Sequence, residues 1–264
     1  EICACLVGSE MCIRDRGNVI TNIDYTDVFD FHSKKKADIT LIYKNHAIPQ
    51  GYDRPITLDV DNDGKVNQIF VKPGVVDKEV FNHAYGSILI KKDILMSEIR
   101  NAISVNQLDV KRLLQSSLGK YSIYAYENKG YCAAISSIND YFEFNMDLMK
   151  KEVRDELFNP QRPIYTKVRD DAPSRYGLTS NVKNSIIAQG CVINGDVENC
   201  VISKGVYVGE GAKLSNCIVM QDTKIGCNTN LNYVIIDKDV TIKDGRSLMG
   251  YDSYPIYIAK KSVV

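Results

Sequence analysis

The sequence predicts an α/β protein in which a mixed domain of helices and strands precedes a left-handed parallel β-helix of hexapeptide repeats. In the last third of the chain, aliphatic residues recur in steps of six, six and five, so the pattern repeats after seventeen positions. Upstream, segments with helical and strand periodicity alternate along the chain. Three inward side chains per turn, each followed by a bend, describe a triangular coil whose turns share one apolar interior.

The seventeen-residue period is carried by series of aliphatic residues that we expect to point inward and stack as ladders. These are Ile202, Val219 and Ile236; Val208, Ile225 and Ile242; and Leu214 with Leu231. The residues just before the first series keep the same period, namely Val201, Ile218 and Ile235. A shorter turn through Ile187, Ile193 and Val197 leads into the coil. An ordinary β-sandwich is disfavoured because its strands would show alternation instead of triplets.

Small and turn-forming residues stand where the coil needs corners. Four are Gly205, Gly209, Gly211 and Gly226, and three more are Asp222, Asn228 and Asp239, which tolerate left-handed backbone angles. Outward residues such as Tyr207 and Tyr233 are candidate contact sites for a partner, although exposed aromatics are also ordinary surface residues.

Composition excludes several functional classes. The 264 residues include 33 basic and 33 acidic side chains, so no charge excess favours nucleic acid or a membrane surface. No apolar stretch is long enough to span a bilayer. Of eight cysteines, Cys191, Cys200, Cys217 and Cys227 lie among the repeats without a nearby histidine, and Cys200 and Cys217 occupy equivalent rungs. We expect them to be buried thiols in a cytoplasmic protein, in preference to a disulfide or metal site.

Residues 1–16 differ in character from the rest of the chain. The string from Cys5 to Arg16 resembles a translated sequencing adapter, and the apolar run before it lacks the features of a secretory signal. We therefore interpret residues 1–16 as non-native and assign no function to Cys3, Cys5 or Cys12.

Residues 17–159 show the mixed pattern, and residues 160–264 form the linker and the coil. Helices are predicted at Thr26–Lys36, Asp93–Ala102, Val110–Ser116 and Ile138–Lys150. Strands are predicted at Ile39–Tyr43, Ile56–Val60 and Val66–Val71, and as a pair at Ser122–Tyr126 and Tyr131–Ile135 that the last helix faces. Pro160 and Pro163 mark the start of the linker, which continues to Tyr176.

One acidic segment imitates a calcium loop. Asp59, Asp61, Asp63 and Gly64 have the spacing of an EF-hand start, but the twelfth place, which needs a bidentate acid, is Phe70. The segment is therefore predicted to be a solvated hairpin turning at Asp63-Gly64.

Several ordered motifs resemble the bacterial glucose-1-phosphate adenylyltransferase family. Gly17-Asn18-Val19-Ile20 through Asp24-Tyr25 is similar to its Gly-Asp-His-Ile-Tyr motif, which continues after two residues with Asp-Tyr. Phe70-Val71-Lys72-Pro73 resembles its Glu-Lys-Pro motif, and Gly130-Tyr131 through Asn145-Met146-Asp147-Leu148 resembles its Gly-Tyr-Trp stretch ending in Asn-Met-Asp-Leu. Arg162–Thr166 and Tyr254-Pro255-Ile256 resemble the entry and closing strand of its β-helix. The resemblance implies that residues 17–159 are part of a nucleotidyltransferase domain, Rossmann-like and of GT-A type.

The resemblance also implies a site that has lost its charge. The family joins ATP to a sugar 1-phosphate with Mg²⁺ held by carboxylates. At the two metal-carboxylate positions this sequence has Asn18 and Ala134, so we assign no catalytic residue and no metal ligand. Val71 replaces a glutamate and Ala84 a serine of the sugar pocket, whereas Lys72 keeps a cation for a sugar phosphate. An ordinary solvated lysine at a strand end is the equally weighted alternative for Lys72.

The pattern resembles the family's non-catalytic regulatory subunit. We expect this fragment to bind no cofactor, since Mg²⁺ belongs to the intact catalytic members and the glycine-rich nucleotide loop has no counterpart here. Expected partners are a catalytic adenylyltransferase subunit, a second copy of the chain, or both, with glucose 1-phosphate as a candidate ligand.

Two alternatives remain open. The first is an active sugar-1-phosphate nucleotidyltransferase using another carboxylate, for which Asp24 is the nearest candidate. The second is a hexapeptide-repeat acyltransferase, which would need a histidine base on the coil. The three histidines, His32, His46 and His83, all precede the coil, which disfavours acyl transfer.

Overall fold

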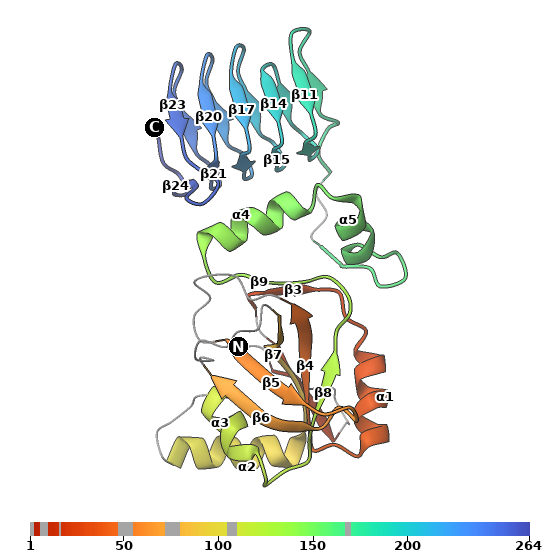
Figure 1. Ribbon diagram of the computed structural model, residues 1–264. Coiled ribbons are helices and arrows are strands. Elements are labelled where there is room, and N and C mark those ends of the chain that lie inside the picture. Colours follow the sequence, from red (N-terminus) through yellow and green to blue (C-terminus); the bar gives the residue numbers. More distant parts are fainter. Residues whose placement is uncertain are drawn as a thin grey trace. The chain divides into compact units, whose positions relative to one another are not determined.

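The computed structural model describes residues 3–5, 10–15, 17–46, 55–71, 80–104, 110–166 and 170–264. Backbone contacts divide the chain into two compact units, Glu1–Ser136 and Ser137–Val264. The first holds a mixed α/β sheet and the second a parallel β-helix of hexapeptide repeats, so the predicted fold class is confirmed at this level (Figure 1).

The main sheet of the first unit is mixed, with one parallel neighbour pair. Its strands are β1 (Cys3–Cys5), β2 (Met11–Arg14), β4 (Ile39–His46), β5 (Ile56–Val60), β6 (Val66–Val71), β7 (Phe81–Lys91) and β8 (Ile123–Glu127). The order is β1-β2-β7-β4-β8, with β5 pairing both β6 and β7, and only β4 and β8 run parallel. A separate two-stranded sheet joins β3 (Val19–Thr21) to β9 (Cys132–Ala134).

Helices cover both faces of this sheet. On one face, Val28 of α1 (Tyr25–Lys35) packs with Ile42 and Leu89. On the other, Leu114 of α3 (Val110–Ser117) joins the larger core together with side chains of α2 (Lys92–Ser104). The alternation of β4 side chains between these two cores explains why its first four residues are all buried.

Helix α1 lies one residue before the predicted bounds of Thr26–Lys36, and a capping residue defines each of its ends. The Asp24 carboxylate caps it by accepting a hydrogen bond from the Thr26 N–H at 2.8 Å. Lys36 ends it in a left-handed conformation with φ of 51°, and basic side chains occupy the last turn, where the helix dipole favours them.

The acidic segment after β5 is a hairpin turn, as predicted. Strands β5 and β6 pair antiparallel, and one oxygen of Asp61 accepts hydrogen bonds from the N–H groups of Asp63 and Lys65, both at 2.9 Å. Gly64 takes φ of 86°, and the Asp63 carboxylate forms an ion pair with Lys35 of α1 at 2.5 Å.

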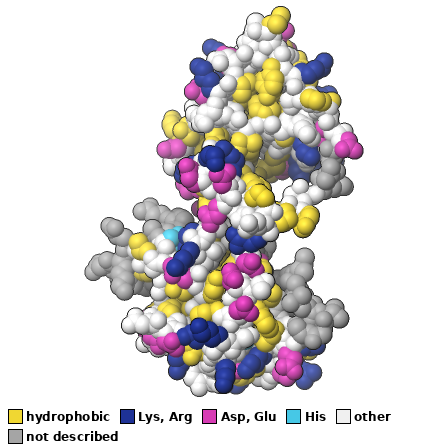
Figure 2. All heavy atoms as spheres, turned by 90° about the vertical axis from the view of Figure 1, so that its right-hand side faces the viewer, with side chains coloured by type: hydrophobic (Ala, Val, Ile, Leu, Met, Phe, Trp, Pro, Cys, Tyr) yellow, Lys and Arg dark blue, Asp and Glu magenta, His cyan; other side chains and the backbone are white. Residues whose placement is uncertain are grey.

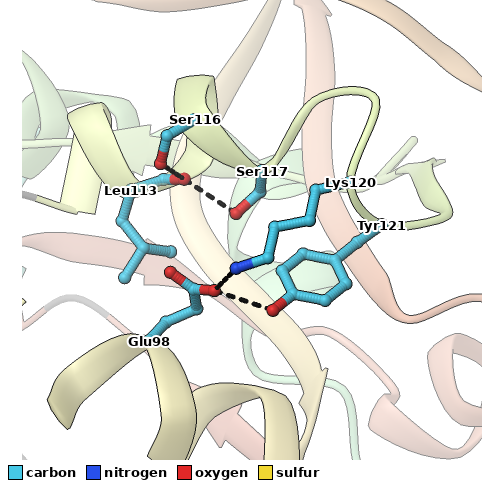
Figure 3. Close-up of polar contacts among 6 residues, drawn as sticks. All are labelled: Glu98, Leu113, Ser116, Ser117, Lys120 and Tyr121. Carbon is cyan, nitrogen blue, oxygen red and sulfur yellow. Dashed lines mark hydrogen bonds and ion pairs between the residues drawn. The ribbon is translucent and has the colours of Figure 1, made fainter. Parts of the chain in front are cut away.

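A buried carboxylate joins α2 to the segment between α3 and β8 (Figure 3). Glu98 is 8% exposed and binds the Lys120 ammonium and the Tyr121 hydroxyl, the latter at 2.7 Å. Hydrogen bonds from Lys120 and Tyr121 hold the pKa of the Glu98 carboxyl below its usual value. The ion pair is needed because a lone carboxylate at this depth would be costly to desolvate.

Three details differ from the sequence-based expectation. The strands predicted as a pair are β8 and β9, but β8 pairs with β4 and β9 pairs with β3. The helix predicted over Ile138–Lys150 ends at Asp147 as α4 (Ile138–Asp147), and a further helix that we did not predict, α5 (Lys151–Leu157), follows it. Residues 11–14, which we interpret as non-native, pair with β7, and Cys12 is 2% exposed in the core. Their origin stays a prediction, because an apolar segment of any source can complete a sheet edge.

The coil consists of three parallel sheets of five short strands each (Figure 1). The first contains β10 (Arg175–Tyr176), β13 (Val192–Ile193), β16 (Tyr207–Val208), β19 (Lys224–Ile225) and β22 (Thr241–Ile242). The second contains β11 (Asn181–Lys183), β14 (Asp196–Glu198), β17 (Lys213–Ser215), β20 (Asn230–Asn232) and β23 (Ser247–Met249). The third contains β12 (Ile186–Ile187), β15 (Val201–Ile202), β18 (Ile218–Val219), β21 (Val234–Ile236) and β24 (Ile256–Ile258).

The predicted period is the register of these sheets. Val208 pairs with Ile225, Leu214 with Leu231, and Val219 with Ile236, each seventeen residues apart. These side chains form the coil's core with the buried thiols of Cys200 and Cys217. The four cysteines of the coil, Cys191, Cys200, Cys217 and Cys227, are free thiols, and burial raises the pKa of the Cys217 thiol.

The corners use two different properties of their residues. Asp222, Asn228 and Asp239 take φ of 57°, 53° and 58°, as their residue types predicted. Gly209 and Gly226 have no such angle, contrary to our reasoning from backbone freedom. A Cβ on Gly226 would lie 2.6 Å from the Asp244 nitrogen of the next turn, so these glycines are needed for their size.

A second apolar ladder faces outward from the third sheet and seats α4. Ile218 and Ile235 are buried there against Phe142 of α4, which explains why the positions before the first series also keep the period. The ring of Tyr233 lies 5.8 Å from that of Phe142, so Tyr233 is not the free outward contact residue that we predicted. Tyr207 is 39% exposed.

The coil's compact unit begins at Ser137, because α4 packs on the coil, whereas we placed the domain boundary at residue 160. Basic and acidic side chains are interspersed over the visible faces of both units (Figure 2). Among the described residues, no helix is long and apolar enough to cross a bilayer.

Candidate functional site

The two positions at which the family resemblance implies metal carboxylates lie next to each other. Strands β3 and β9 pair antiparallel, with Val19 opposite Ala134. The Ile135 N–H donates to the Asn18 carbonyl at 2.8 Å, which closes the end of the pair. Positions 18 and 134, far apart in the sequence, are therefore brought to one place, as a shared metal site would require.

The side chains at this place serve the fold. The Asn18 amide nitrogen donates to the Ile135 carbonyl oxygen at 2.9 Å. A carboxylate in the same position would face that oxygen without a proton to offer. Ala134 is 5% exposed and contributes only a methyl group. Neither residue brings negative charge, and across the described parts of the chain no three His, Cys, Asp or Glu side chains gather closely enough to hold a metal ion.

Of the other predicted site residues, one lies outside the described part of the chain and three lie within it. Lys72, our candidate for binding a sugar phosphate, lies outside the described residues. Val71 ends β6 and is half-buried, and Ala84 is 3% exposed within β7. Asp24, the carboxylate of the catalytic alternative, caps α1 with its side chain.

Polar side chains hold the Gly130-Tyr131 segment that leads into β9. The Lys44 ammonium donates to the Gly130 carbonyl, and the Thr21 hydroxyl donates to the Tyr131 carbonyl at 3.0 Å. Asn128, which is 8% exposed, donates to the Thr21 hydroxyl at 3.0 Å and accepts from the Gly130 N–H at 3.0 Å. This segment is thus fixed from β3 and β4 together.

A cluster that sequence reasoning missed lies where β4 and β7 pair. It comprises His46, His83 and Tyr85, with the Tyr85 hydroxyl 2.6 Å from His46 Nε2 and His83 Nδ1 3.3 Å from the same nitrogen. The Cys132 thiol of β9 contacts Tyr85, and burial raises its pKa to about 12. The signal was the alternation His83-x-Tyr85 in a strand, which puts both side chains on one face.

The third histidine is separate from this cluster. His32 of α1 is 3% exposed, and its Nδ1 lies 2.8 Å from the Thr40 hydroxyl. Burial lowers the pKa of His32, followed by the effect of the nearby Lys91 charge. The side chain is therefore a neutral core residue at physiological pH.

Comparison with known proteins agrees with the two-part architecture. Residues 167–254 match the model of the GlmU-like C-terminal hexapeptide family. The chain is 31% identical over 251 residues to glycogen biosynthesis protein GlgD of Bacillus subtilis (strain 168), covering 95% of this chain and 63% of that protein. It is also 31% identical over 269 residues to glucose-1-phosphate adenylyltransferase of Acetivibrio thermocellus, covering 94% and 61%.

A second GlgD protein matches a shorter part of the chain. Glycogen biosynthesis protein GlgD of Geobacillus stearothermophilus is 38% identical over 124 residues, covering 38% of this chain and 36% of that protein. The chain spans about three-fifths of the length of the first two relatives, 63% and 61%. With the mixed sheet, the hexapeptide coil and these matches in agreement, the chain belongs to the family of glucose-1-phosphate adenylyltransferases and GlgD glycogen biosynthesis proteins.

Proposed function

We propose that this chain belongs to a non-catalytic, GlgD-like subunit that assembles with a catalytic glucose-1-phosphate adenylyltransferase subunit, with itself, or with both. In that assembly it supports the formation of ADP-glucose from ATP and glucose 1-phosphate for glycogen synthesis. The observation that carries the proposal is the uncharged pair of residues, Asn18 and Ala134, at the end of β3 and β9.

The chemistry explains why that observation matters. Transfer of a nucleotidyl group builds negative charge on the phosphates, and Mg²⁺ neutralises it only where anionic ligands hold the ion. An amide oxygen can touch Mg²⁺ but brings no charge, and a methyl group brings no ligand at all. The Asn18 amide nitrogen also donates to a backbone carbonyl, so the orientation of this side chain is set by the fold.

The coil supports the assembly part of the proposal. It keeps its full set of inward ladders, and its outward side chains include the exposed Tyr207. Aromatic side chains of this kind are enriched in protein interfaces. We therefore expect Tyr207 to be one of the coil residues that contact the partner subunit.

The test is a rate comparison on the full-length protein that carries this chain. Alone, with ATP, glucose 1-phosphate and Mg²⁺, it should release no pyrophosphate, whereas it should co-purify with a catalytic subunit and raise that subunit's rate. Asn18→Ala should leave the enhancement within about twofold, because Asn18 binds no metal in this proposal. Tyr207→Ala should weaken the complex, with Lys224→Ala, an exposed neighbour on the same sheet, as the matched control.

Two results would contradict the proposal. Mg²⁺-dependent pyrophosphate release by the protein alone, reduced at least tenfold by Asn18→Ala, would establish an active nucleotidyltransferase. The absence of a complex together with an unchanged rate would remove the subunit role. Acyl transfer is disfavoured independently, because no histidine occurs in the coil sequence.

A further inference from the structure

A cluster of three donor atoms lies between β4 and β7, apart from the residues that the proposed function uses. The atoms are Nε2 of His46, Nδ1 of His83 and the hydroxyl oxygen of Tyr85. His83 and Tyr85 are 1% and 2% exposed, and His46 is half-buried at the end of β4. Because His83 and Tyr85 alternate along one strand, their positions are fixed by the ladder that pairs β4 with β7.

His46 Nε2 has two polar neighbours within the cluster, but it can form a well-directed hydrogen bond with only one of them. His46 Nε2 lies 2.6 Å from the Tyr85 hydroxyl and 3.3 Å from His83 Nδ1. An imidazole nitrogen has either one proton or one lone pair in the plane of its ring. It can therefore form a well-directed hydrogen bond with only one of these two partners. A cation between the three atoms would use a lone pair from each of them.

The spacing of the two nitrogens fits such an ion. Zinc-class ions bind imidazole nitrogen at about 2.0–2.1 Å, and two nitrogens 3.3 Å apart would then subtend about 107° at the metal. That angle is close to the tetrahedral value, whereas the Tyr85 oxygen, 2.6 Å from His46 Nε2, would subtend only about 80° and must move away from that nitrogen when the ion binds. The ring centroids of His46 and His83 are 5.5 Å apart with the planes inclined by 19°, so the half-buried His46 ring would have to reorient for both in-plane lone pairs to meet at the ion.

We propose that His46, His83 and Tyr85 form a site for one divalent ion of the zinc class, with a fourth position open to water. The three side chains would bind through the two ring nitrogens and the phenolic oxygen, and binding would release the Tyr85 proton to solvent. Imidazole ligands select zinc-class ions over Mg²⁺, which prefers oxygen. The site is therefore distinct in chemistry from a magnesium site between phosphates.

Neighbouring groups suit this assignment. The Cys132 thiol of β9 contacts the Tyr85 side chain beside the three donor atoms. The Lys44 ammonium on the same strand face as His46 is engaged by the Gly130 carbonyl. One of its three N–H groups is therefore directed to that carbonyl.

Titration of the full chain with Co²⁺ tests the proposal, since its visible absorption reports tetrahedral coordination. We expect one Co²⁺ per chain, displaced by Zn²⁺ and not by Mg²⁺. His46→Gln and His83→Gln should each weaken binding at least about tenfold. His32→Gln is the matched control, because His32 is also buried in the first unit but lies outside the cluster, and it should leave the affinity unchanged.

Far-ultraviolet circular dichroism of each variant shows whether the fold survives. If His83→Gln fails to fold, the half-buried His46→Gln variant decides the question alone. No tetrahedral Co²⁺ spectrum in the unmodified chain would overturn the proposal. Equal affinity in His46→Gln and His32→Gln would overturn it as well, since the ion would then be bound elsewhere, for example by cysteine thiols.

Discussion

The coil and the β3–β9 pair differ in the structural constraint that acts on each residue position. In the coil, every turn repeats the same demand, an aliphatic side chain directed inward and a residue that can bend at the corner. In the β3–β9 pair, each position has a single neighbour, and Asn18 meets the Ile135 carbonyl while Ala134 fills a small buried space. The coil is therefore constrained by the same packing in every turn, whereas each position of the β3–β9 pair is constrained by its own neighbour.

The largest effect should follow from opening a cavity in the coil. Leu231→Ala removes a fully buried side chain in the middle of a ladder and should lower the free energy of unfolding by about 3 kcal/mol. Asn230→Ala, an exposed neighbour in β20, should change it by less than about 0.5 kcal/mol. Chemical denaturation followed by circular dichroism measures both, and equal effects would contradict the inward and outward assignment.

Substitutions at two glycines test whether a corner needs glycine for its small size or for its positive φ. Gly226→Ala would push a Cβ to 2.6 Å from the Asp244 nitrogen and should cost about 2 kcal/mol. Gly245 has φ of 70° and open space around it, so Gly245→Asn should cost only a few tenths of a kcal/mol. Thermal unfolding distinguishes the two. If Gly226→Ala proved as mild as Gly245→Asn, the turns of the coil would have to be more loosely stacked than described.

Glu98 makes the stability of the first unit depend on acidic pH. Its pKa is lowered on folding, so its contribution to stability is complete above the unfolded pKa of about 4.3 and is lost as pH falls through the folded pKa. Glu98→Gln should therefore lower the free energy of unfolding by about 1.5 kcal/mol at pH 7 and by much less near pH 3. The exposed Glu127→Gln serves as control, and a Glu98→Gln effect independent of pH would show that the ion pair with Lys120 does not contribute.

The sequence predicted the coil better than the first unit because the coil repeats the same packing in every turn. Repetition let the ladders of Val219 and Leu214 be read directly, whereas the pairing of β9 with β3 depends on contacts between distant segments that no local pattern shows. The outward ladder of Ile218 and Ile235 was visible as a period, but its partner, α4, was not. At the site, the motifs pointed to Asn18 and Ala134, which the structure brings together, and the cluster around His46 escaped because it forms only when β4 and β7 pair.

The smallest predicted effect concerns the place where the coil's repetition is broken. Asn199 and Asn216 hold a left-handed corner with φ of 52° and 51°, and seventeen residues later Tyr233 holds it with φ of 52°. The left-handed conformation costs tyrosine about 1 kcal/mol more than asparagine, and the contact of its ring with Phe142 of α4 offsets this cost. Tyr233→Asn should thus change stability by less than about 1 kcal/mol.

A double-mutant cycle isolates the ring contact. Combined with Phe142→Ala, Tyr233→Asn should show a coupling energy of about 1 kcal/mol, and once Phe142 is gone the asparagine should stabilise the coil by relieving the strained corner. Tyr207→Asn, at an outward position in β16, supplies the reference for replacing an outward tyrosine. Strictly additive effects of Tyr233→Asn and Phe142→Ala would mean that the tyrosine breaks the asparagine ladder without helping to seat the helix.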